Sequence, residues 1–368
     1  MNFFDKRIIS HFNFEIILFI LPLIFLSHHL IGEISPMLAQ KQILYFTIAF
    51  MAFVFVFFLP IRKFIGFIPI LYWIGIILLF AVLVVGTTKL GATRWLQVPL
   101  IHLTIQPSEL FKPIFILMMA YLVHKNPPSK EGYNLKEFSY LSFYILLPFL
   151  LIAKEPDLGT ALVLLLVGYG ILFIVGINIR IVLSITLILA VSSPLIYTYL
   201  IKDYQKKRIH DFIAEKPSYH VQQSIIAIGS GGLLGKDIKE ATQTQLKFLP
   251  IATSDFIFAY LVERYGFVGS FALIGLYLLL ISYLLILTFY FKQDFLISVF
   301  STGVGLLIFL DMSINILMVI GFAPVVGLPL PMFSYGGSSF INFIVIFAIL
   351  ENLLAFRFKA GYEYTKKF

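Results

Sequence analysis

The sequence of 368 residues contains no cysteine, and only 12% of its residues carry a formal charge. The absence of cysteine excludes disulfide bonds, zinc–thiolate sites, iron–sulfur clusters and thiol nucleophiles. The low charge excludes most water-soluble classes, because a soluble domain carries roughly twice that charged fraction. Intrinsic disorder is excluded as well, since 40 Phe and 19 Tyr supply far more apolar area than an unfolded segment contains.

Long apolar runs make up most of the chain, of which 60% is hydrophobic. The runs have the length that a helix needs to cross a bilayer, rather than the shorter alternating pattern of a barrel strand. We therefore predict an all-α polytopic membrane protein that forms a single domain over residues 1–368. The ten predicted spans are 14–31, 43–59, 65–86, 109–124, 138–153, 158–177, 179–201, 266–291, 295–320 and 338–356.

The basic residues mostly stand at the ends of these runs, so the net charge of +8 indicates membrane topology rather than a nucleic-acid partner. If the N-terminus is cytoplasmic, thirteen Lys and Arg fall in inside segments and four in the short outside loops. We therefore expect both termini in the cytoplasm. The long outside segment, residues 202–265, carries nine more Lys and Arg. We set these aside because long loops translocate largely regardless of charge. No cleavage site follows the first run, so we expect a retained span.

That outside segment, residues 202–265, is the only stretch long enough for a small extracytoplasmic structure. Its first part mixes charged with apolar residues and is followed by a glycine-rich stretch, Gly229–Gly235. We expect an amphipathic helix at the outer membrane surface and then a tight turn. No fixed-period repeat or pair of broken inverted segments is visible, which argues against an ordinary secondary transporter.

Charged side chains inside or beside apolar segments are costly, so they mark candidate functional positions. The first group contains Arg94 and Trp95, followed by Ser108, Glu109 and Lys112. Ser108 is suited to cap the fourth span, and Glu109 and Lys112 share one helix face. The group is either a capped helix with an ion pair and an aromatic anchor, or a site where Arg94 and Lys112 hold an anionic phosphate.

Two further acidic residues stand at expected helix starts. Asp157 lies in a charged turn, residues 154–160, and is placed to cap the sixth span. Asp255 follows Thr253-Ser254 and precedes an apolar, aromatic helix at the rim of the membrane. Asp255 is either an ordinary helix cap or a general base, because desolvation at an apolar boundary raises the pKa of a carboxyl group.

Polar residues also occur late in the chain. Asp311 and Asn315 lie four residues apart on the ninth span, where they mark either a polar cavity or a structural hydrogen bond. Residues 321–339 are too rich in proline and glycine for a spanning helix, so we expect an irregular loop folded against the protein at the outer face. The sequence has no Walker A motif, which excludes nucleotide hydrolysis by the usual route.

These clusters, in this order on ten spans, resemble the SEDS family (shape, elongation, division and sporulation). The strongest match is N-x5-GFAPVVGLPLPMFSYGGSS, from Asn315 to Ser339, with support from QPSELFK, EPDLGT, IAIGSGGLLGK, TQTQLKFLP and SDFIFA. The TQTQ-FLP stretch favours the elongation member of the family over the division member. The chain departs from the family in two places, since Thr253-Ser254 replaces the frequent His-Thr and Phe322 replaces an aliphatic residue.

The resemblance implies a peptidoglycan glycosyltransferase of the bacterial inner (cytoplasmic) membrane that polymerises lipid II, with its active site facing the periplasm. The implied partners are a class B penicillin-binding protein, which crosslinks the strands, and other membrane proteins of the elongation complex. Asp255 matches the family's essential extracytoplasmic acid, and Trp95 a tryptophan that the family needs. Glu109 and Lys112 match a polar pair of its central cavity.

On this basis we expect an inverting transfer in which a hydroxyl of lipid II attacks the anomeric carbon of a lipid-linked growing strand. Asp255 would be the base, while Arg94 and Lys112 would offset charge on the lipid pyrophosphate. Glu109 would orient Lys112, and Trp95 would stack on sugar or pack against lipid. The sequence requires no cofactor and shows no metal site, although a divalent cation could share the work. A lipid II flippase and a non-catalytic scaffold of the cell-wall machinery remain as alternatives.

Overall fold

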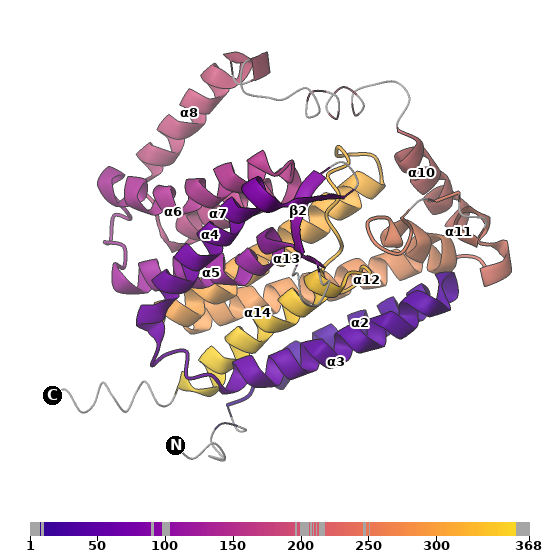
Figure 1. Ribbon diagram of the computed structural model, residues 1–368, viewed down its shortest axis with the longest axis horizontal. Coiled ribbons are helices and arrows are strands. Elements are labelled where there is room, and N and C mark those ends of the chain that lie inside the picture. The colour runs from indigo at the N-terminus through magenta and orange to yellow at the C-terminus, as the bar shows by residue number, and fades with distance from the viewer. Residues whose placement is uncertain are drawn as a thin grey trace.

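The structure is a computed structural model of the chain. It describes residues 8, 11–89, 92–97, 104–195, 197–198, 206, 208, 210, 212, 218–245, 248–249 and 251–357. Within these residues a bundle of long helices carries a small sheet and a group of short helices at one end (Figure 1). The predicted all-α membrane architecture is confirmed, and the small sheet is an addition that the sequence did not suggest.

Each predicted span overlaps one long helix. The helices are α2 (Phe14–Ile34), α3 (Pro36–Phe58), α4 (Ile68–Val85), α5 (Pro107–Lys125), α6 (Leu135–Lys154), α7 (Leu158–Val175), α8 (Ile179–Leu195), α12 (Ile257–Tyr290), α13 (Phe295–Val319) and α14 (Gly337–Ala355). Among the described residues, eight helices are long and apolar enough to cross a membrane, and α5 and α8 are not among them. α5 is interrupted by charged residues and proline, and α8 has 17 residues. The chain is thus a multi-pass membrane protein, while the count of ten spans stays a prediction.

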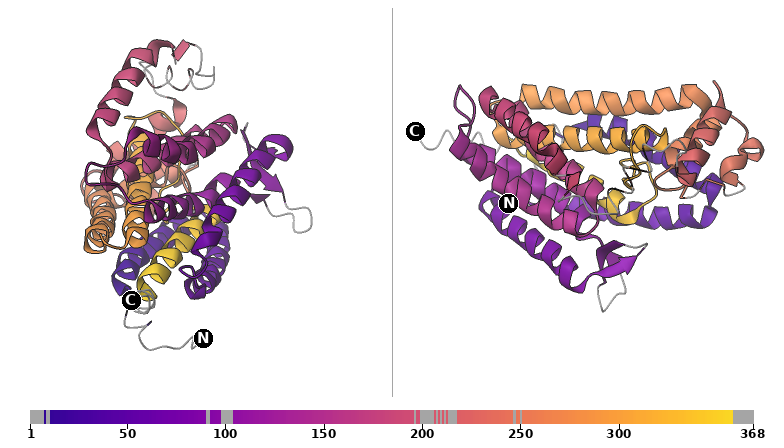
Figure 2. Two further views of the ribbon diagram at one scale, coloured as in Figure 1. Left: turned by 90° about the vertical axis from the view of Figure 1, so that its left-hand side faces the viewer. Right: turned by 90° about the horizontal axis from the view of Figure 1, so that it is seen from above.

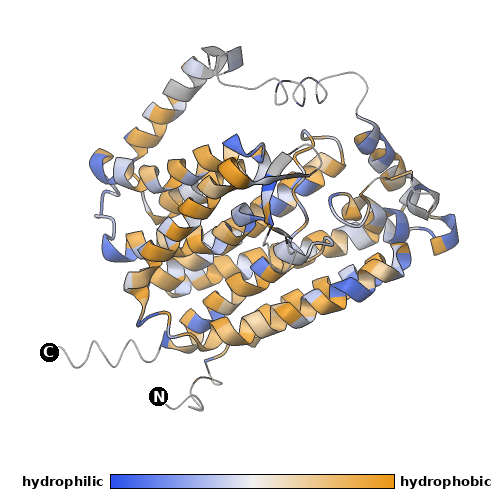
Figure 3. Ribbon diagram, in the orientation of Figure 1, coloured by the Kyte–Doolittle hydropathy of each residue, from blue (hydrophilic) through white to orange (hydrophobic). Residues whose placement is uncertain are grey.

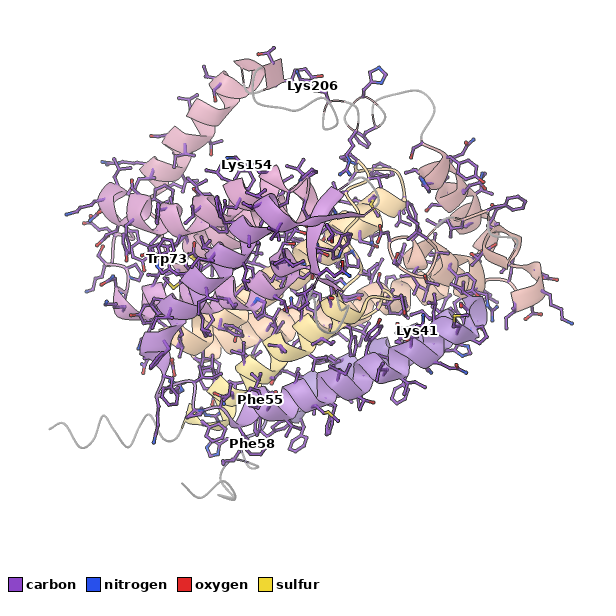
Figure 4. All side chains as sticks on the ribbon, in the orientation of Figure 1. Lys41, Phe55, Phe58, Trp73, Lys154 and Lys206 are labelled. Atoms are coloured by element: carbon purple, nitrogen blue, oxygen red, sulfur yellow. The ribbon has the colours of Figure 1, made fainter. Side chains whose placement is uncertain are left out.

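Burial separates inner from outer helices. α13 and α14 are the most buried of the membrane-length helices, and α3 is the least buried. Phe55 on α3 is 68% exposed and Trp73 on α4 is 42% exposed, both on the outside of the bundle (Figure 4). Apolar residues continue along most of these helices (Figure 3). Such a large exposed apolar surface is suited to lipid rather than to water.

α5 lies inside the bundle because its neighbours present glycine to it. A Cβ atom added to Gly303 of α13 would lie 2.5 Å from Ile116 of α5, and one added to Gly75 of α4 would lie 2.6 Å from Phe111. Small residues at helix crossings allow such close approach in membrane bundles. The polar first turn of α5 is therefore held deep among other helices. α8, in contrast, projects away from the bundle (Figure 1 and the left view of Figure 2).

One end of the bundle carries the short elements. Strands β1 (Thr87–Lys89), β2 (Ala92–Gln97) and β3 (Thr104–Ile105) form an antiparallel sheet in that order. Helix α10 (Tyr219–Gly231), the 3-10 turn η3 (Ile238–Glu240) and α11 (Thr242–Gln245) lie beside the start of α12. The start of α2 and the end of α14 meet at the opposite end, where Asn13 N donates to Glu351 Oε2 at 3.0 Å.

The predicted start of the eighth span at residue 266 coincides with a break inside α12 (Ile257–Tyr290). Gly266 has φ 63° and ψ −160°, so it separates a short helix before it from the long helix after it. Arg264, just before the kink, pairs with Glu33 of α2 at 2.8 Å.

The glycine-rich part of the outside segment 202–265 follows the expected order. α10 buries one face, and its C-cap Gly232 and then Gly235 have positive φ, so helix and turn are both present. Most of residues 202–217, as well as Leu246, Lys247 and Pro250 of the TQTQLKFLP motif, lie outside the described residues.

Candidate active site

Asp255 lies in the turn that leads into α12, and hydrogen bonds from the α13–α14 region hold its backbone. Three successive carbonyl oxygens each accept one bond. The pairs are Tyr335 N to Thr253 O (2.8 Å), Ser334 Oγ to Ser254 O (2.7 Å) and Asn315 Nδ2 to Asp255 O (2.9 Å). The position of the acid is therefore fixed by a part of the chain far away in sequence.

The segment that supplies these donors is the irregular loop expected between α13 and α14. It packs against the bundle, where Ser27 Oγ donates to Phe333 O at 2.5 Å and Tyr277 OH donates to Pro331 O at 2.6 Å. Asn315 also donates to Leu328 O at 2.6 Å, so one amide holds both the loop and the acid. Irregular backbone inside a membrane protein needs such partners, because no water is there to satisfy it.

The carboxyl group of Asp255 is partly buried beside the loop. A Cβ atom added to Gly327 would lie 3.6 Å from Asp255 Oδ2, and Gly327 has φ 73°, a conformation that favours glycine. Burial raises the pKa of Asp255 above its ordinary value, while a hydrogen bond from Ser254 and the charge of Arg94 oppose the rise. A carboxylate in this setting is a stronger base than one in water. Ser254, which departs from the family pattern, thus contacts the acid directly.

Arg94 lies on β2 and reaches the turn before α7. Its Nη1 atom is 3.6 Å from Asp157 Oδ1, and its Nη2 atom donates to Pro156 O. The Arg94 side chain is 16% exposed, whereas that of Asp157 is 3% exposed. The Arg94 side chain is therefore held by the turn before α7 and keeps a small part of its surface exposed.

The expected helix-capping roles of Ser108 and Asp157 are wrong. α5 begins at Pro107 with Gln106 at its N-cap, and Asp157 stands at the N-cap of α7 without a cap hydrogen bond. Asp157 Oδ2 instead accepts bonds from Ser108 Oγ at 3.2 Å and Gln106 Nε2 at 3.1 Å. Arg94 adds a charge-assisted contact to the same carboxylate, which outcompetes the backbone of α7.

Glu155 is a buried acid in the segment 154–160, which was interpreted from the sequence only as a charged turn. It is 1% exposed, and both carboxyl oxygens lack a hydrogen-bond partner among the described residues. Burial raises the pKa of Glu155 to about 8, with a further rise from the charge of Asp157 and opposition from Arg94. Glu155 is therefore largely protonated at neutral pH.

Lys112 is fully buried in a cluster of its own. Its Nζ atom lies 2.8 Å from Glu109 Oε1 and 3.5 Å from Asp311 Oδ2. The predicted Glu109–Lys112 pair is present, and Asp311 joins it. Among the described residues no direct contact links Lys112 to Asp255. One turn of α13 connects them, because Asp311 faces Lys112 while Asn315 holds Asp255.

Four helices begin around this region. The start of α5 contacts the start of α7 through Gln106 and Asp157, and the start of α14 contacts the turn before α12 through Tyr335 and Thr253. The N-terminal end of a helix carries a partial positive charge and unpaired N–H groups, which favour anions. The region is thus electrostatically suited to phosphate even though acids line it.

Trp95 neighbours Arg94 on β2, where Thr87 Oγ1 donates to its carbonyl oxygen at 3.1 Å. Successive side chains on a strand point to opposite faces, so Trp95 does not share the environment of Arg94. Among the described residues, no group of three or more His, Asp or Glu side chains is arranged to hold a metal ion. The structural hydrogen bond expected as one interpretation of Asp311 and Asn315 is present at Asn315, but its two acceptors, Asp255 O and Leu328 O, were not predicted from the sequence.

Comparison with known proteins identifies the family. A model for the FtsW, RodA and SpoVE proteins, described as cell cycle protein, matches residues 5–359. The chain is 52% identical over 364 residues to the peptidoglycan glycosyltransferase MrdB of Helicobacter pylori, covering 99% of this chain and 95% of the relative. It is 36% identical over 302 residues to MrdB of Escherichia coli, covering 80% of each chain.

Solved structures agree. A chain in a study of the structural coordination of polymerization and crosslinking by a peptidoglycan synthase complex has a TM-score of 0.79 and 28% identity, covering 95% of this chain and 99% of that one. The rod shape determining protein RodA of Thermus thermophilus has a TM-score of 0.71 and 26% identity, covering 94% and 98%. The chain therefore belongs to the SEDS family, as its signature from Asn315 to Ser339 indicated.

Proposed function

We propose that this chain is a peptidoglycan glycosyltransferase that polymerises lipid II into glycan strands during cell elongation, with Asp255 as general base. The name of the MrdB relatives supports the activity. The observation that carries the role of Asp255 is its geometry. Hydrogen bonds hold the backbone on three consecutive carbonyl groups, while the carboxyl group stands against a glycine that leaves room beside it.

In the proposed reaction a hydroxyl oxygen of lipid II forms a bond to the anomeric carbon of the lipid-linked strand. The bond from that carbon to the diphosphate breaks, and its electron pair leaves with the diphosphate oxygen. The hydroxyl proton passes to Asp255, and the configuration at the carbon inverts. Because burial raises the pKa of Asp255, the carboxylate binds this proton more readily than an exposed Asp does.

The leaving diphosphate needs positive charge. Arg94 is held by Asp157 and Pro156 with part of its surface open, so it is placed to contact the diphosphate. Lys112 has no exposed surface, so its charge acts on the diphosphate through the protein interior. Glu109 orients the ammonium group. A divalent cation could share the charge on the diphosphate. Trp95 packs against lipid or stacks on sugar at the sheet.

As finer proposals, the protein lies in the bacterial inner membrane with both termini in the cytoplasm and the Asp255 end at the periplasm. We also propose that it works beside a class B penicillin-binding protein and other elongation-complex proteins. The similarity to a chain of a peptidoglycan synthase complex that coordinates polymerization and crosslinking supports such a partner.

Purified protein and purified lipid II in detergent test the function. Wild-type protein, with its transpeptidase partner, should form glycan strands, and Asp255→Asn should not, although it remains folded and membrane-inserted. Strand formation by Asp255→Asn at the wild-type rate would remove the acid from the mechanism.

The flippase alternative predicts functional acids deep in the bundle. The deep acid Asp311 is instead paired with Lys112, whereas Asp255 stands at the start of a helix beside an irregular loop. Polymerisation in detergent needs no second compartment, so strands made there separate the enzyme from a flippase. A folded complex that makes no strands would favour the scaffold.

A further inference from the structure

A cavity of about 240 Å³ lies beside the candidate active site, and the proposed mechanism does not use it. Three polar residues line it, namely Arg208, Ser218 and His220, together with residues 321 and 323–325 of the α13–α14 loop. Its volume is below the roughly 300–1,000 Å³ of pockets that enclose a whole drug-sized ligand. The cavity therefore accommodates one group of a larger substrate.

The chemistry of the cavity favours an anion. Arg208 supplies a guanidinium group and His220 an imidazole, and none of the described residues that line it carries a carboxylate. Ser218 stands at the N-cap of α10, a helix of 13 residues, so the first N–H groups of that helix begin at the cavity. Ser218 Oγ has no hydrogen-bond partner among the described residues.

The cavity adjoins Asp255 by two routes. The ring of His220 stacks on Phe256, the residue after the acid, with centroids 6.2 Å apart. The loop that forms one wall also continues from Val325 to Gly327, which stands against the Asp255 carboxyl group. Two residues of chain span at most about 7 Å, so the wall of the cavity and the acid are close neighbours.

The same loop also packs on the start of α7. Its residues Val326 and Leu328 pack on Gly159, where an added Cβ atom would lie 3.1 Å from Leu328 and 3.3 Å from Val326. Gly159 follows the turn that holds Arg94. The loop thus has three neighbours: the cavity at residues 321 and 323–325, Asp255 at Gly327, and the start of α7 after the turn that holds Arg94.

A polymerase of lipid-linked sugars must hold two diphosphates at once, one on the donor strand and one on the acceptor. We infer that the cavity binds the diphosphate of the acceptor lipid II, while Arg94 contacts the donor diphosphate. This inference rests on the proposed function. It places the acceptor hydroxyl on the side of Asp255 that faces α10.

Initial rates of strand formation against lipid II concentration test the inference in purified complex. Arg208→Gln and His220→Gln remove the cationic and imidazole groups, and Ala323→Leu fills the cavity without removing a charge. Each variant should raise the apparent KM for lipid II, the Arg208 change by about tenfold, as expected for loss of a charge-assisted contact. Inorganic pyrophosphate should compete with lipid II in the wild type and more weakly in Arg208→Gln.

Lys239→Gln is the matched control, because Lys239 is an exposed cation on the same segment outside the cavity. It should leave KM and pyrophosphate inhibition unchanged. Unchanged KM in all three cavity variants overturns the inference, and so does a lower kcat with the wild-type KM. If Arg208→Gln loses pyrophosphate inhibition but keeps its KM, the cavity takes free diphosphate only, which also overturns it. Absence of strands from the wild type would instead refute the proposed function itself.

Discussion

The side-chain amide of Asn315 joins the backbone of Asp255 to that of the α13–α14 loop, with bonds of 2.9 Å to Asp255 O and 2.6 Å to Leu328 O. Asn315 lies on a membrane-length helix and is fully buried. An inner helix thus sets the geometry of a residue at the end of the bundle.

Asn315→Ala removes both bonds and leaves two carbonyl groups without partners. We expect a loss of polymerisation rate on the order of 100-fold, as for a misplaced catalytic group, and a destabilisation of about 1–3 kcal/mol per carbonyl. The matched control is Asn352→Ala. Asn352 is also buried and donates to Phe57 O and Leu59 O, but at the opposite end of the bundle. Equal rate losses in both variants would show that Asn315 acts on stability alone.

Gly327→Ala should impair catalysis more than folding. The new methyl group would stand 3.6 Å from Asp255 Oδ2, where the reaction needs space, and φ 73° would strain alanine by about 1–2 kcal/mol. Gly229→Ala is the control, since nothing lies within 4 Å of a Cβ there and the residue belongs to α10. A Gly327→Ala enzyme with normal kcat would place the sugar away from this glycine. Rates with lipid II and thermal unfolding in detergent measure the two effects.

Lys112→Met should destabilise the bundle by about 3–5 kcal/mol, because it leaves Glu109 and Asp311 buried beside each other without a cation. A triple variant, Lys112→Met with Glu109→Gln and Asp311→Asn, should restore thermal stability by removing all three charges. Its polymerisation rate then separates a structural role from an electrostatic one. Wild-type activity in the triple variant would contradict the proposed contribution of Lys112.

Glu155 should make stability depend on pH. Burial raises the pKa of Glu155 from its ordinary 4.5 to about 8 in the folded protein, so folding favours its protonated form. This contribution is complete below pH 4.5 and is lost as pH rises to about 8. Glu155→Gln should therefore raise the unfolding temperature at pH 8.5 more than at pH 5.0. Exposed Glu131→Gln should change it little at either pH, and equal effects of Glu155→Gln at both values would contradict the assignment.

The sequence predicted the helical bundle well, because long apolar runs leave a chain few other structures in a membrane. It also predicted the irregular loop after residue 320 and the pairing of Glu109 with Lys112. It could not show that Asp157 holds Arg94 rather than capping a helix, since that choice depends on β2 bringing Arg94 to the turn before α7. Neither the sheet nor the link from Asn315 to Asp255 has a local pattern, because both arise from contacts between distant segments.

The kink at Gly266 ties the start of α12 to its surroundings. A Cβ atom on Gly266 would lie 2.4 Å from Gly235 N, and one on Gly235 would lie 2.1 Å from Arg264 O. The two backbone segments are therefore in direct contact, with no side chain between them. Arg264, two residues before the kink, also donates hydrogen bonds to Glu33 on α2. Residues 257–265 are therefore packed backbone to backbone against the glycine turn after α10, so a larger residue at Gly235 or Gly266 would force one of these two segments to shift.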